Sequence, residues 1–391
     1  MLPKIFFPFF LPFIFRCAQI SQYNNQNNLV ALKENSDTFS NHSGMGDTTN
    51  GLIIVTGKMQ TARAAHTATL LKNGKVLITG GFAGSTFLSS AEIFDPALKT
   101  STTVKQMSVA RSAHTATLLP NGQVLIAGGY NGSYHSGTEI FDPQTQTFSA
   151  GPKMNTPRSG HTTTYLNNGK ILFAGGVGIG WSFLQSAELY DIDAKTFTPT
   201  GSLTTARESH TATLLKNGSV LITGGHKDRR ADIKIYASAE LYDPVSKKFR
   251  LLGNMSIIRH KHDAVRLADG KVLITGGSDE RDSEGAYKNA EIYDPLSSTF
   301  EQAGNMHITR YKHNGTSILL PNGNVLIAGG SNRAEIYQPS TGKFSIVSGG
   351  MGTKRLFSCA TLLQNGKVLI TGGYNENQEP GANAWLYSYR K

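Results

Sequence analysis

Short apolar runs recur along the chain, and the same turn residues separate them. One copy is ARSAHTATLLPNGQVLIAGG at residues 110–129, and close variants lie at residues 62–81 and 206–225. Within each copy an Asn-Gly pair stands between two runs rich in Val, Ile, Leu and Thr. Asn-Gly favours a two-residue hairpin, because both turn positions need positive φ. Each copy therefore predicts two antiparallel strands.

Two further strands complete each unit. After a loop of variable length comes a segment such as AEIFDP or AELYDP, which ends in a turn-favouring Asp-Pro pair. The next segment carries an aromatic residue, as at Phe148, Phe197 and Phe249, and ends near a methionine such as Met154. We expect four short strands in every unit.

The units repeat at intervals typical of a β-propeller. Each contains a Gly-Gly pair, and successive pairs are 48, 47, 49, 52, 53 and 43 residues apart. Helical repeats usually have shorter periods than this. The pairs are Gly80-Gly81, Gly128-Gly129, Gly175-Gly176, Gly224-Gly225, Gly276-Gly277, Gly329-Gly330 and Gly372-Gly373.

The two ends of the repeat region complement each other. The seventh unit stops after its third strand, at residues 384–388, whereas Gly51–Met59 precedes the first unit and has the pattern of a fourth strand. Six complete units and these two pieces predict an all-β, seven-bladed propeller. An N-terminal strand that completes the C-terminal blade would close the ring and remove its open edges.

The Gly-Gly pairs, the aromatic residues of the third and fourth strands, and the period resemble kelch repeats. The phrase RxxHTATLLxNGKVLIxGG, followed by AEIYDP, is similar to bacterial exported kelch-type proteins. The resemblance covers about residues 51–391 and implies a kelch β-propeller like the central domain of galactose oxidase. It specifies no single function, because kelch propellers include adaptors, glycan-related proteins and copper oxidases.

The N-terminal residues have the pattern of an export signal. Lys4 precedes an apolar run at residues 5–15, which has signal-peptide length and is too short to span a membrane. We expect a signal peptide or lipoprotein leader at residues 1–18, a disordered polar tether at 19–50 and the propeller at 51–391. The protein would be exported to the cell surface, the periplasm or the medium. Cys17 would be either removed or lipidated, although Arg16 departs from the small residue expected near such a cleavage site.

Composition and charge narrow the range of partners. The chain has 38 Lys and Arg against 27 Asp and Glu, a formal charge of +11, which suits acidic glycans or anionic surfaces. We expect no nucleic-acid partner, because no basic helix or nucleic-acid module is present, and membrane contact only through an anchor at Cys17. The cysteines are Cys17 and Cys359, so the sequence has no CxxC motif and no cysteine zinc site.

An arginine precedes the first strand of every unit. In a kelch-like propeller this strand is innermost, so the arginines should surround the mouth of the central channel. They either form a ring that binds carboxylates or phosphates, or tie the blades together by pairing with a repeated acid. We favour the second interpretation, because a regularly repeated charge usually serves the repeat. The residues are Arg63, Arg111, Arg158, Arg207, Arg259, Arg310 and Arg355.

Histidine and glutamate repeat alongside the arginine. His114 follows Arg111 by three residues, and Glu139 lies in the third strand of the same unit. The seventh unit lacks both residues, having Ser358 and Trp385 instead. This joint loss predicts His–Glu hydrogen bonds between strands rather than a metal site built from the histidines.

The loops after the Gly-Gly pairs, here called the variable loops, differ most between units and should share one face. The loop at residues 226–238 is basic and the loop at 278–289 is acidic. Aromatic residues beside arginine suit glycan stacking or protein hot spots. The ligand-binding candidates are Tyr130, Tyr134, His135, Trp181, Phe183, His226, Arg229, Arg230 and Tyr287.

These features predict a monomeric, non-catalytic binding or scaffold module with no metal and no cofactor. Its variable-loop face would recognise a protein or an acidic glycan. The alternative is a kelch-type carbohydrate enzyme that resembles sialic-acid mutarotases or, with less support, galactose oxidase. The oxidase resemblance implies a Tyr–Cys crosslink, a second Tyr and two His, whereas Cys359 aligns with a small residue, Thr115, of the second unit.

Overall fold

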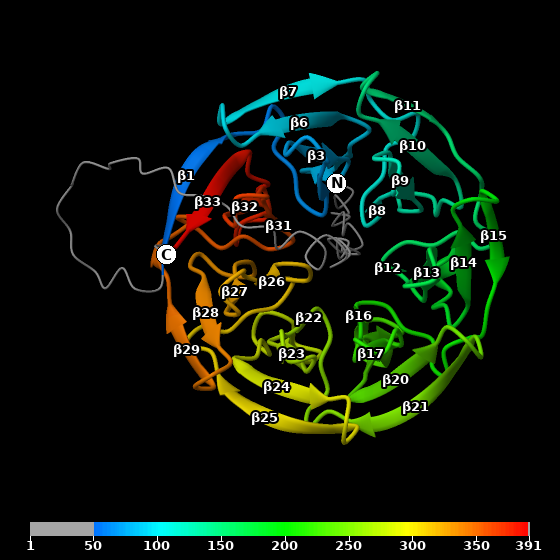
Figure 1. Ribbon diagram of the computed structural model, residues 1–391, viewed down its shortest axis with the longest axis vertical. Coiled ribbons are helices and arrows are strands. Elements are labelled where there is room, and N and C mark those ends of the chain that lie inside the picture. The colour runs from blue at the N-terminus through cyan, green and yellow to red at the C-terminus, as the bar shows by residue number, and fades with distance from the viewer. Residues whose placement is uncertain (1–50, 390–391) are drawn as a thin grey trace, which may run out of the picture.

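Seven blades surround a central axis, as the repeat predicts; six have four strands, and the seventh has four with a short fifth strand at its edge (Figure 1). The structure is a computed structural model and describes residues 51–389. The expected leader, the tether and Cys17 lie outside the described residues. The first strand of each blade lies nearest the axis and the fourth lies at the rim (Figure 1).

The strands of each blade are antiparallel and follow one another outward from the axis. Blades 1 to 3 contain β2 (Thr67–Leu70), β3 (Val76–Thr79), β6 (Ala91–Asp95) and β7 (Thr100–Val104); β8 (Thr115–Leu118), β9 (Val124–Ala127), β10 (Thr138–Asp142) and β11 (Thr147–Ala150); and β12 (Thr162–Tyr165), β13 (Lys170–Ala174), β14 (Ala187–Asp191) and β15 (Thr196–Pro199). Blades 4 to 6 contain β16 (Thr211–Leu214), β17 (Val220–Thr223), β20 (Ser238–Asp243) and β21 (Lys248–Asn254); β22 (Asp263–Arg266), β23 (Val272–Thr275), β24 (Asn289–Asp294) and β25 (Thr299–Asn305); and β26 (Ser317–Leu319), β27 (Val325–Ile327), β28 (Glu335–Gln338) and β29 (Lys343–Ile346).

The remaining elements are the seventh blade and short pieces within the loops. Blade 7 contains β31 (Cys359–Leu362), β32 (Val368–Thr371), β33 (Asn383–Ser388), β1 (Leu52–Lys58) and β30 (Ser348–Gly349). The loop elements are the hairpins β4 (Phe82–Ala83) with β5 (Thr86–Phe87) and β18 (His226–Lys227) with β19 (Lys234–Ile235), and the 3-10 helices η3 (Ile179–Trp181) and η4 (Arg230–Asp232).

The N-terminal strand closes the ring, which confirms the expected closure. β1 pairs antiparallel with β33, from Leu52 opposite Ser388 to Lys58 opposite Asn383, and parallel with the short β30. Ile53 of β1 is buried in the same cluster as Trp385 of β33. Both ends of the repeat region therefore lie in one sheet, and neither leaves the ring open.

The Gly-Gly pair joins each blade to the next. The second glycine donates its backbone N–H to the carbonyl oxygen of the arginine that opens the following blade, as Gly129 does to Arg158 at 2.9 Å. This bond occurs at all seven blade junctions with lengths of 2.8 to 3.0 Å, and Gly373 to Arg63 completes the circle. The first glycine of each pair has no room for a side chain. A Cβ on Gly128 would lie 2.4 Å from the Arg158 oxygen, and the φ of Gly128, +66°, favours glycine.

Six of the seven repeated arginines are buried and paired with a glutamate of their own blade. The Arg111 guanidinium contacts Glu139 at 2.9 Å and also donates to the Gly128 oxygen at 2.7 Å. Glu139 accepts in addition from the backbone N–H of Ser108, in the connection that enters the blade. The other pairs are Arg63–Glu92, Arg158–Glu188, Arg207–Glu240, Arg259–Glu291 and Arg310–Glu335, at 2.6 to 3.0 Å.

The arginines therefore pair with the repeated acid, as we favoured, but each ion pair lies within one blade. The blades are joined instead through the backbone carbonyl of each arginine, which accepts from the second glycine of the preceding blade. The open ring of guanidinium groups is wrong for these six, because their side chains are at most 1% exposed. Arg355, in the seventh unit, is the exception because it has no glutamate at the equivalent position of its blade. Trp385 replaces the glutamate, and the Arg355 guanidinium lies 5.0 Å from the centre of its ring.

The expected His–Glu pair is wrong. Each repeated histidine instead reaches into the preceding blade, and His114 contacts the hydroxyls of Thr67 at 3.2 Å and Thr79 at 3.1 Å. His66 makes the equivalent contact with Thr371 at 2.9 Å, across the closure. The glutamate is already used by the arginine and the backbone, so the histidine becomes a second link between blades.

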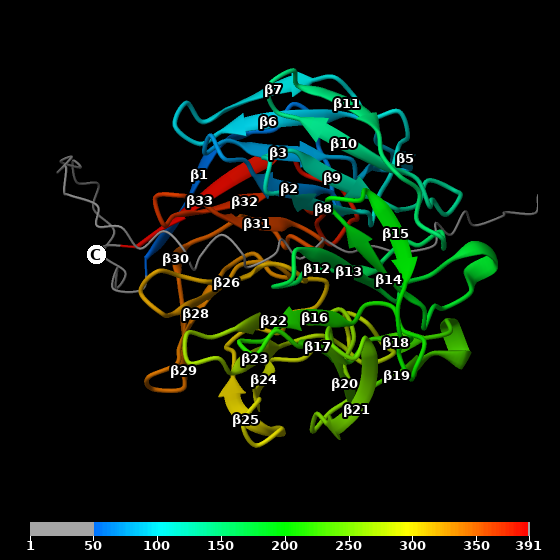
Figure 2. The ribbon, with the colours of Figure 1, turned by 45° about the vertical axis from the view of Figure 1, so that its right-hand side comes forward.

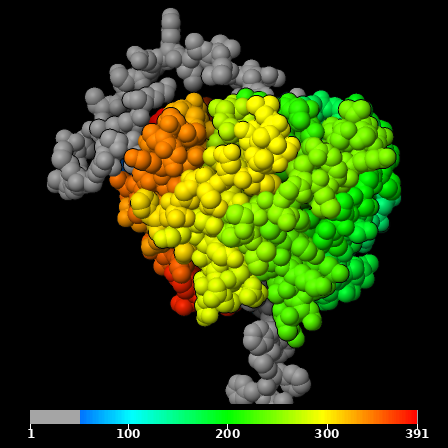
Figure 3. All heavy atoms as spheres, turned by 90° about the horizontal axis from the view of Figure 1, so that it is seen from below, coloured from blue at the N-terminus to red at the C-terminus, as the bar shows by residue number. Residues whose placement is uncertain are grey.

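The sixth blade departs from the repeat at its inner edge. His313 lies nine positions before the Asn of its Asn-Gly turn, whereas His114 of the second unit lies seven positions before its own. The two extra residues are accommodated at Asn314 and Gly315. The buried carboxylate of Asp263, in the fifth blade, accepts backbone N–H groups from Gly315, Thr316 and Ser317 at 2.7 to 2.9 Å. Figure 3 shows the outer side of blades 4 to 6, which lie next to one another.

Replacing the first glycine of a pair should weaken the whole ring. We expect Gly128→Ala to lower the free energy of unfolding by roughly 3 kcal/mol, from left-handed strain plus the clash with the neighbouring blade. Gly169→Ala is the matched control, because Gly169 also has positive φ but a Cβ there meets nothing within 4 Å. Its loss should be about 1 kcal/mol. Equal losses in urea unfolding would contradict the role of the pair.

The buried histidines should make the protein less stable in acid. Burial, reinforced by the nearby arginines, lowers the pKa of His114 and of His313 to about 3. Between pH 6.5 and 3 the unfolded chain binds protons that the native chain does not, so stability falls as the pH falls. The slope should be ~1.4 kcal/mol per pH unit for each such histidine. Urea unfolding at pH 7.5, 6.0 and 5.0 measures it, and His114→Gln should make it shallower. A slope unchanged in His114→Gln would contradict the assignment.

Candidate functional site

The variable loops gather on one face of the propeller, around the mouth of the channel. Each begins opposite the residue that follows a repeated arginine, as the bridges Ser112 to Tyr130 and Glu208 to His226 show. The loops of the third and fourth blades, beside β14 and the β18–β19 hairpin, protrude to the right in Figure 2. Because strands alternate in direction, the Asn-Gly and Asp-Pro turns lie on the opposite face.

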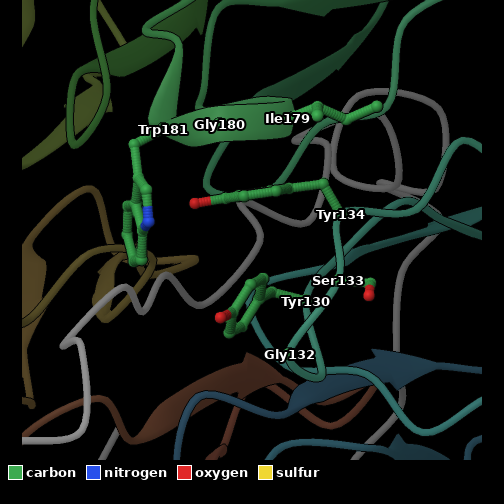
Figure 4. Close-up of a pocket in the computed structure, with 7 residues that line it drawn as sticks. All are labelled: Tyr130, Gly132, Ser133, Tyr134, Ile179, Gly180 and Trp181. Atoms are coloured by element: carbon green, nitrogen blue, oxygen red, sulfur yellow. The ribbon is translucent and has the colours of Figure 1, made fainter.

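A cavity of about 360 Å³ opens between the loops of the second and third blades. Its walls include Tyr130, Tyr134 and Trp181, whose rings point toward one another while the Ile179 side chain points away (Figure 4). The ring centres of Tyr130 and Tyr134 are 4.9 Å apart, and Trp181 lies 5.9 Å from Tyr134. This size is that of a small-ligand pocket, and the aromatic faces suit a flat or ring-shaped ligand.

Arginine and histidine continue the aromatic wall toward the axis. The Arg229 guanidinium lies 4.6 Å from the ring centre of Trp181 and 5.6 Å from that of Phe183. Phe183 in turn lies 5.6 Å from His226. Arg229 also contacts Glu208 at 3.1 Å, which holds the guanidinium over the indole. The loops of blades 2, 3 and 4 therefore form one connected surface.

A ring of backbone surrounds the channel mouth inside these loops. It consists of the residue just before each of the six repeated histidines and, in the seventh unit, the residue before Ser358. All seven have positive φ, from 49° at Ala65 to 61° at Gly160. Neighbours along the ring are hydrogen bonded at six of the seven steps, as Lys312 is to Lys261 at 2.9 Å and Phe357 to Lys312 at 2.8 Å; the step from Gly160 to Ser209 lacks this bond. The ring therefore holds whatever side chains it bears in fixed positions.

Charged side chains occur on only one side of this ring. Blades 1 to 3 have Ala, Ser or Gly at the two positions between arginine and histidine. Blades 4 to 6 have Glu208, His260, Lys261, Tyr311 and Lys312 there. The scaffold accommodates both sets at buried positions, since Ala65 and Ser159 are 0% exposed and Glu208 is 2% exposed.

Two carboxylates and two imidazoles form a chain across blades 4 and 5. Glu208 lies 3.6 Å from His226 Nε2, and His226 Nδ1 lies 3.1 Å from His260 Nδ1. His260 Nε2 lies 3.6 Å from Asp282, on the loop of the fifth blade. Asp282 also pairs with Lys261 and contacts Lys312 at 3.8 Å. Hydrogen-bonding and ionic contacts thus run from Arg229 beside the cavity to Lys312.

Burial shifts the protonation of this chain. Burial and the charge of Lys261 lower the pKa of His260 to about 4, against the opposing effect of Asp282, so this imidazole is neutral at pH 7. Burial, reinforced by Lys261 and opposed by Asp282, lowers the pKa of Lys312 to about 7. Burial alone would raise the pKa of Asp282, but His260, Lys261 and Lys312 hold it well below its usual range.

The structure brings together six of the nine ligand-binding candidates. Tyr130, Tyr134, Trp181, Phe183, His226 and Arg229 form the connected surface just described. Tyr287 instead lies over the Arg259 guanidinium at 6.0 Å, His135 accepts from the Arg158 backbone through its carbonyl, and Arg230 is exposed on η4. These three stand apart from that surface.

Sequence reasoning missed the charged residues of the ring. A signal was present, because the residues between arginine and histidine change from small to charged after the third unit. Phe87 was also missed, and it lies 5.6 Å from Tyr130. Among the described residues no group of three or more His, Cys, Asp or Glu side chains is placed to hold a metal ion. No helix in the described part is long and apolar enough to cross a membrane.

The fold defines the class of the protein as a seven-bladed β-propeller, and part of its repeat matches the kelch motif. The kelch motif model matches residues 63–108 and 111–155, which are the first two units. The structure is similar to that of a fungal alcohol oxidase of the AA5 family in complex with copper, with a TM-score of 0.68 and 17% identity over 88% of this chain and 77% of that one. Identity at this level shows a shared fold alone. No curated protein matches the chain.

The unusual lysine of the site gives a direct test of its geometry. In protein labelled with ¹³C at lysine Cε, one resonance should titrate near pH 7, against an ordinary value of 10.5. Lys312→Arg should remove that resonance, whereas Lys227→Arg, a change at an exposed lysine, should leave it. If every lysine titrates near its ordinary value, Lys312 is not buried as described.

Proposed function

We propose that the protein is an exported, non-catalytic binding module that recognises an acidic glycan through its variable-loop face. The observation that supports this most is the cavity walled by Tyr130, Tyr134 and Trp181, with Arg229 stacked at its edge. Sugar rings pack on aromatic faces, and arginine provides charge and planar hydrogen bonding for carboxylates. The net charge of +11 favours an anionic partner. Export is proposed from residues 1–18 alone.

A protein ligand is the second candidate. Ile179 is 70% exposed and Trp181 is 37% exposed, at the two ends of η3 beside the cavity (Figure 4). Exposed aromatic and aliphatic groups next to arginine are the composition of a protein hot spot. Crosslinking on intact cells, followed by identification of the captured protein, would test this when no glycan binds.

An enzyme is the third candidate, favoured by the chain of Glu208, His226, His260 and Asp282. Neutral His260 could exchange a proton with a ligand hydroxyl, as a sugar mutarotase requires. Sialic-acid anomer exchange followed by NMR tests it, and a rate no higher than buffer would reject it. The similar alcohol oxidase is a copper protein by its description. The donor groups noted above do not fit a copper site, so no copper step is proposed.

Removing the indole should identify the glycan site. We expect the full chain to bind acidic glycans on an array, and Trp181→Ala to weaken that binding by about tenfold or more, through loss of stacking. Leu296→Ala is the control, since Leu296 is 95% exposed in an Asp-Pro turn of the opposite face. Equal binding by both variants would place the glycan elsewhere, and no binding to any glycan would reject the proposal.

A further inference from the structure

Lys261, Lys312 and His260 converge on one carboxylate at the channel mouth. Asp282 pairs with Lys261 and lies 3.8 Å from Lys312 Nζ and 3.6 Å from His260 Nε2. The side chains of the two lysines and the histidine are 1% to 12% exposed, whereas that of Asp282 is 40% exposed. Two ammonium groups and an imidazole thus surround a single anion.

The cationic groups and the carboxylate belong to different parts of the architecture. Lys261 and Lys312 lie on the hydrogen-bonded ring at the inner edge of blades 5 and 6, which all seven blades share. Asp282 lies in the variable loop at residues 278–289, at a positive φ of 56°. Lys261 and Lys312, here called the cradle, are therefore part of the repeated scaffold. The carboxylate comes from a loop whose sequence the repeat does not constrain.

The surroundings of Lys312 favour an exchangeable anion over a purely structural pair. Its ammonium group lies 4.9 Å from the ring of Tyr311, 5.7 Å from Phe357 and 5.8 Å from Tyr374. Aromatic faces stabilise the cation without neutralising it. Glu208, the other carboxylate of the chain, contacts Arg229 and His226. The cradle therefore bears more positive charge than Asp282 supplies in return.

We propose that Lys261, Lys312 and His260 form a carboxylate-binding subsite, and that Asp282 occupies it as an internal competitor. A ligand carboxylate would displace Asp282 and take over its contacts. The identification of that ligand as an acidic sugar rests on the proposed function, whereas the subsite itself requires only carboxylate chemistry. The chain of contacts through His226 and Arg229 joins the subsite to the aromatic cavity, so one acidic glycan could reach both.

The test is to remove the competitor and measure carboxylate binding. We choose Asp282→Gly, because glycine adopts positive φ without strain. Asp228→Gly is a closely matched control, since Asp228 also has positive φ, at 60°, lies in a variable loop and has a side chain 39% exposed. Glucuronate, glucose and acetate are titrated into each full-length protein at pH 6, below the Lys312 pKa of about 7 in the unchanged protein. Asp282 raises that pKa, so its loss in Asp282→Gly lowers the Lys312 pKa, and a bound carboxylate should raise it again.

We expect Asp282→Gly to bind glucuronate and acetate at least tenfold more tightly than the unchanged protein, with no gain for glucose. Asp228→Gly should show no gain, and Lys312→Met added to Asp282→Gly should abolish it. A folded Asp282→Gly protein without tighter carboxylate binding would overturn the proposal, as would a gain that survives Lys312→Met. If Asp282→Gly does not fold, Asp282→Asn keeps the shape, removes the charge and should show the same order of affinities.

The outcomes separate this inference from the proposed function. Tighter acetate binding in Asp282→Gly, with no glycan bound by either protein, would support the subsite and reject acidic-glycan recognition. Glycan binding that depends on Trp181, together with no tighter binding of acetate or glucuronate by Asp282→Gly, would support recognition and overturn the subsite.

Discussion

The ring depends on one hydrogen bond made at every blade junction. The second glycine of each pair donates to the carbonyl of the arginine that opens the next blade, and Gly373 returns the pattern to Arg63. The same arginine uses its guanidinium to hold the first glycine and the glutamate of its own blade. Each junction thus joins two blades through one residue. Removing either charged partner would leave the other buried without compensation, which explains why the motif tolerates little change.

The function-bearing positions are those that this junction leaves free. Two residues lie between the arginine, whose contacts are fixed, and the histidine, which reaches the preceding blade. The backbone of the second of them is held in the left-handed region and is hydrogen bonded to its neighbour around the axis, as between Lys261 and Lys312. The scaffold thereby fixes where a side chain stands without fixing which side chain it is. Blades 4 to 6 use this freedom for charge, and the neighbouring loops add the aromatic wall.

The electrostatics of the mouth differ from those of the blades. In the blades each buried guanidinium faces one glutamate and several carbonyl oxygens, so charge is locally balanced. At the mouth, Asp282 faces two lysines and a histidine. Burial lowers the pKa of both Lys312 and His260, because few water molecules remain to stabilise their charged forms. A region of unbalanced, partly desolvated charge is where an anionic ligand gains most.

The sequence determined the fold because each blade is built from residues close together in the chain, so the repeated units can be counted from the sequence. Asn-Gly turns, strand lengths, seven Gly-Gly pairs and an orphan strand at Gly51–Met59 are enough to place seven blades and their closure. The site was only partly accessible, since the aromatic and arginine residues of the loops were identifiable by type. The sequence did not show which buried polar groups pair with each other, because Arg, His and Glu recur together. Only packing shows that Glu139 contacts Arg111 while His114 contacts Thr79. The convergence of Lys261, Lys312 and Asp282 was likewise decided by tertiary structure, because the ring that aligns the two lysines is made by residues from every blade.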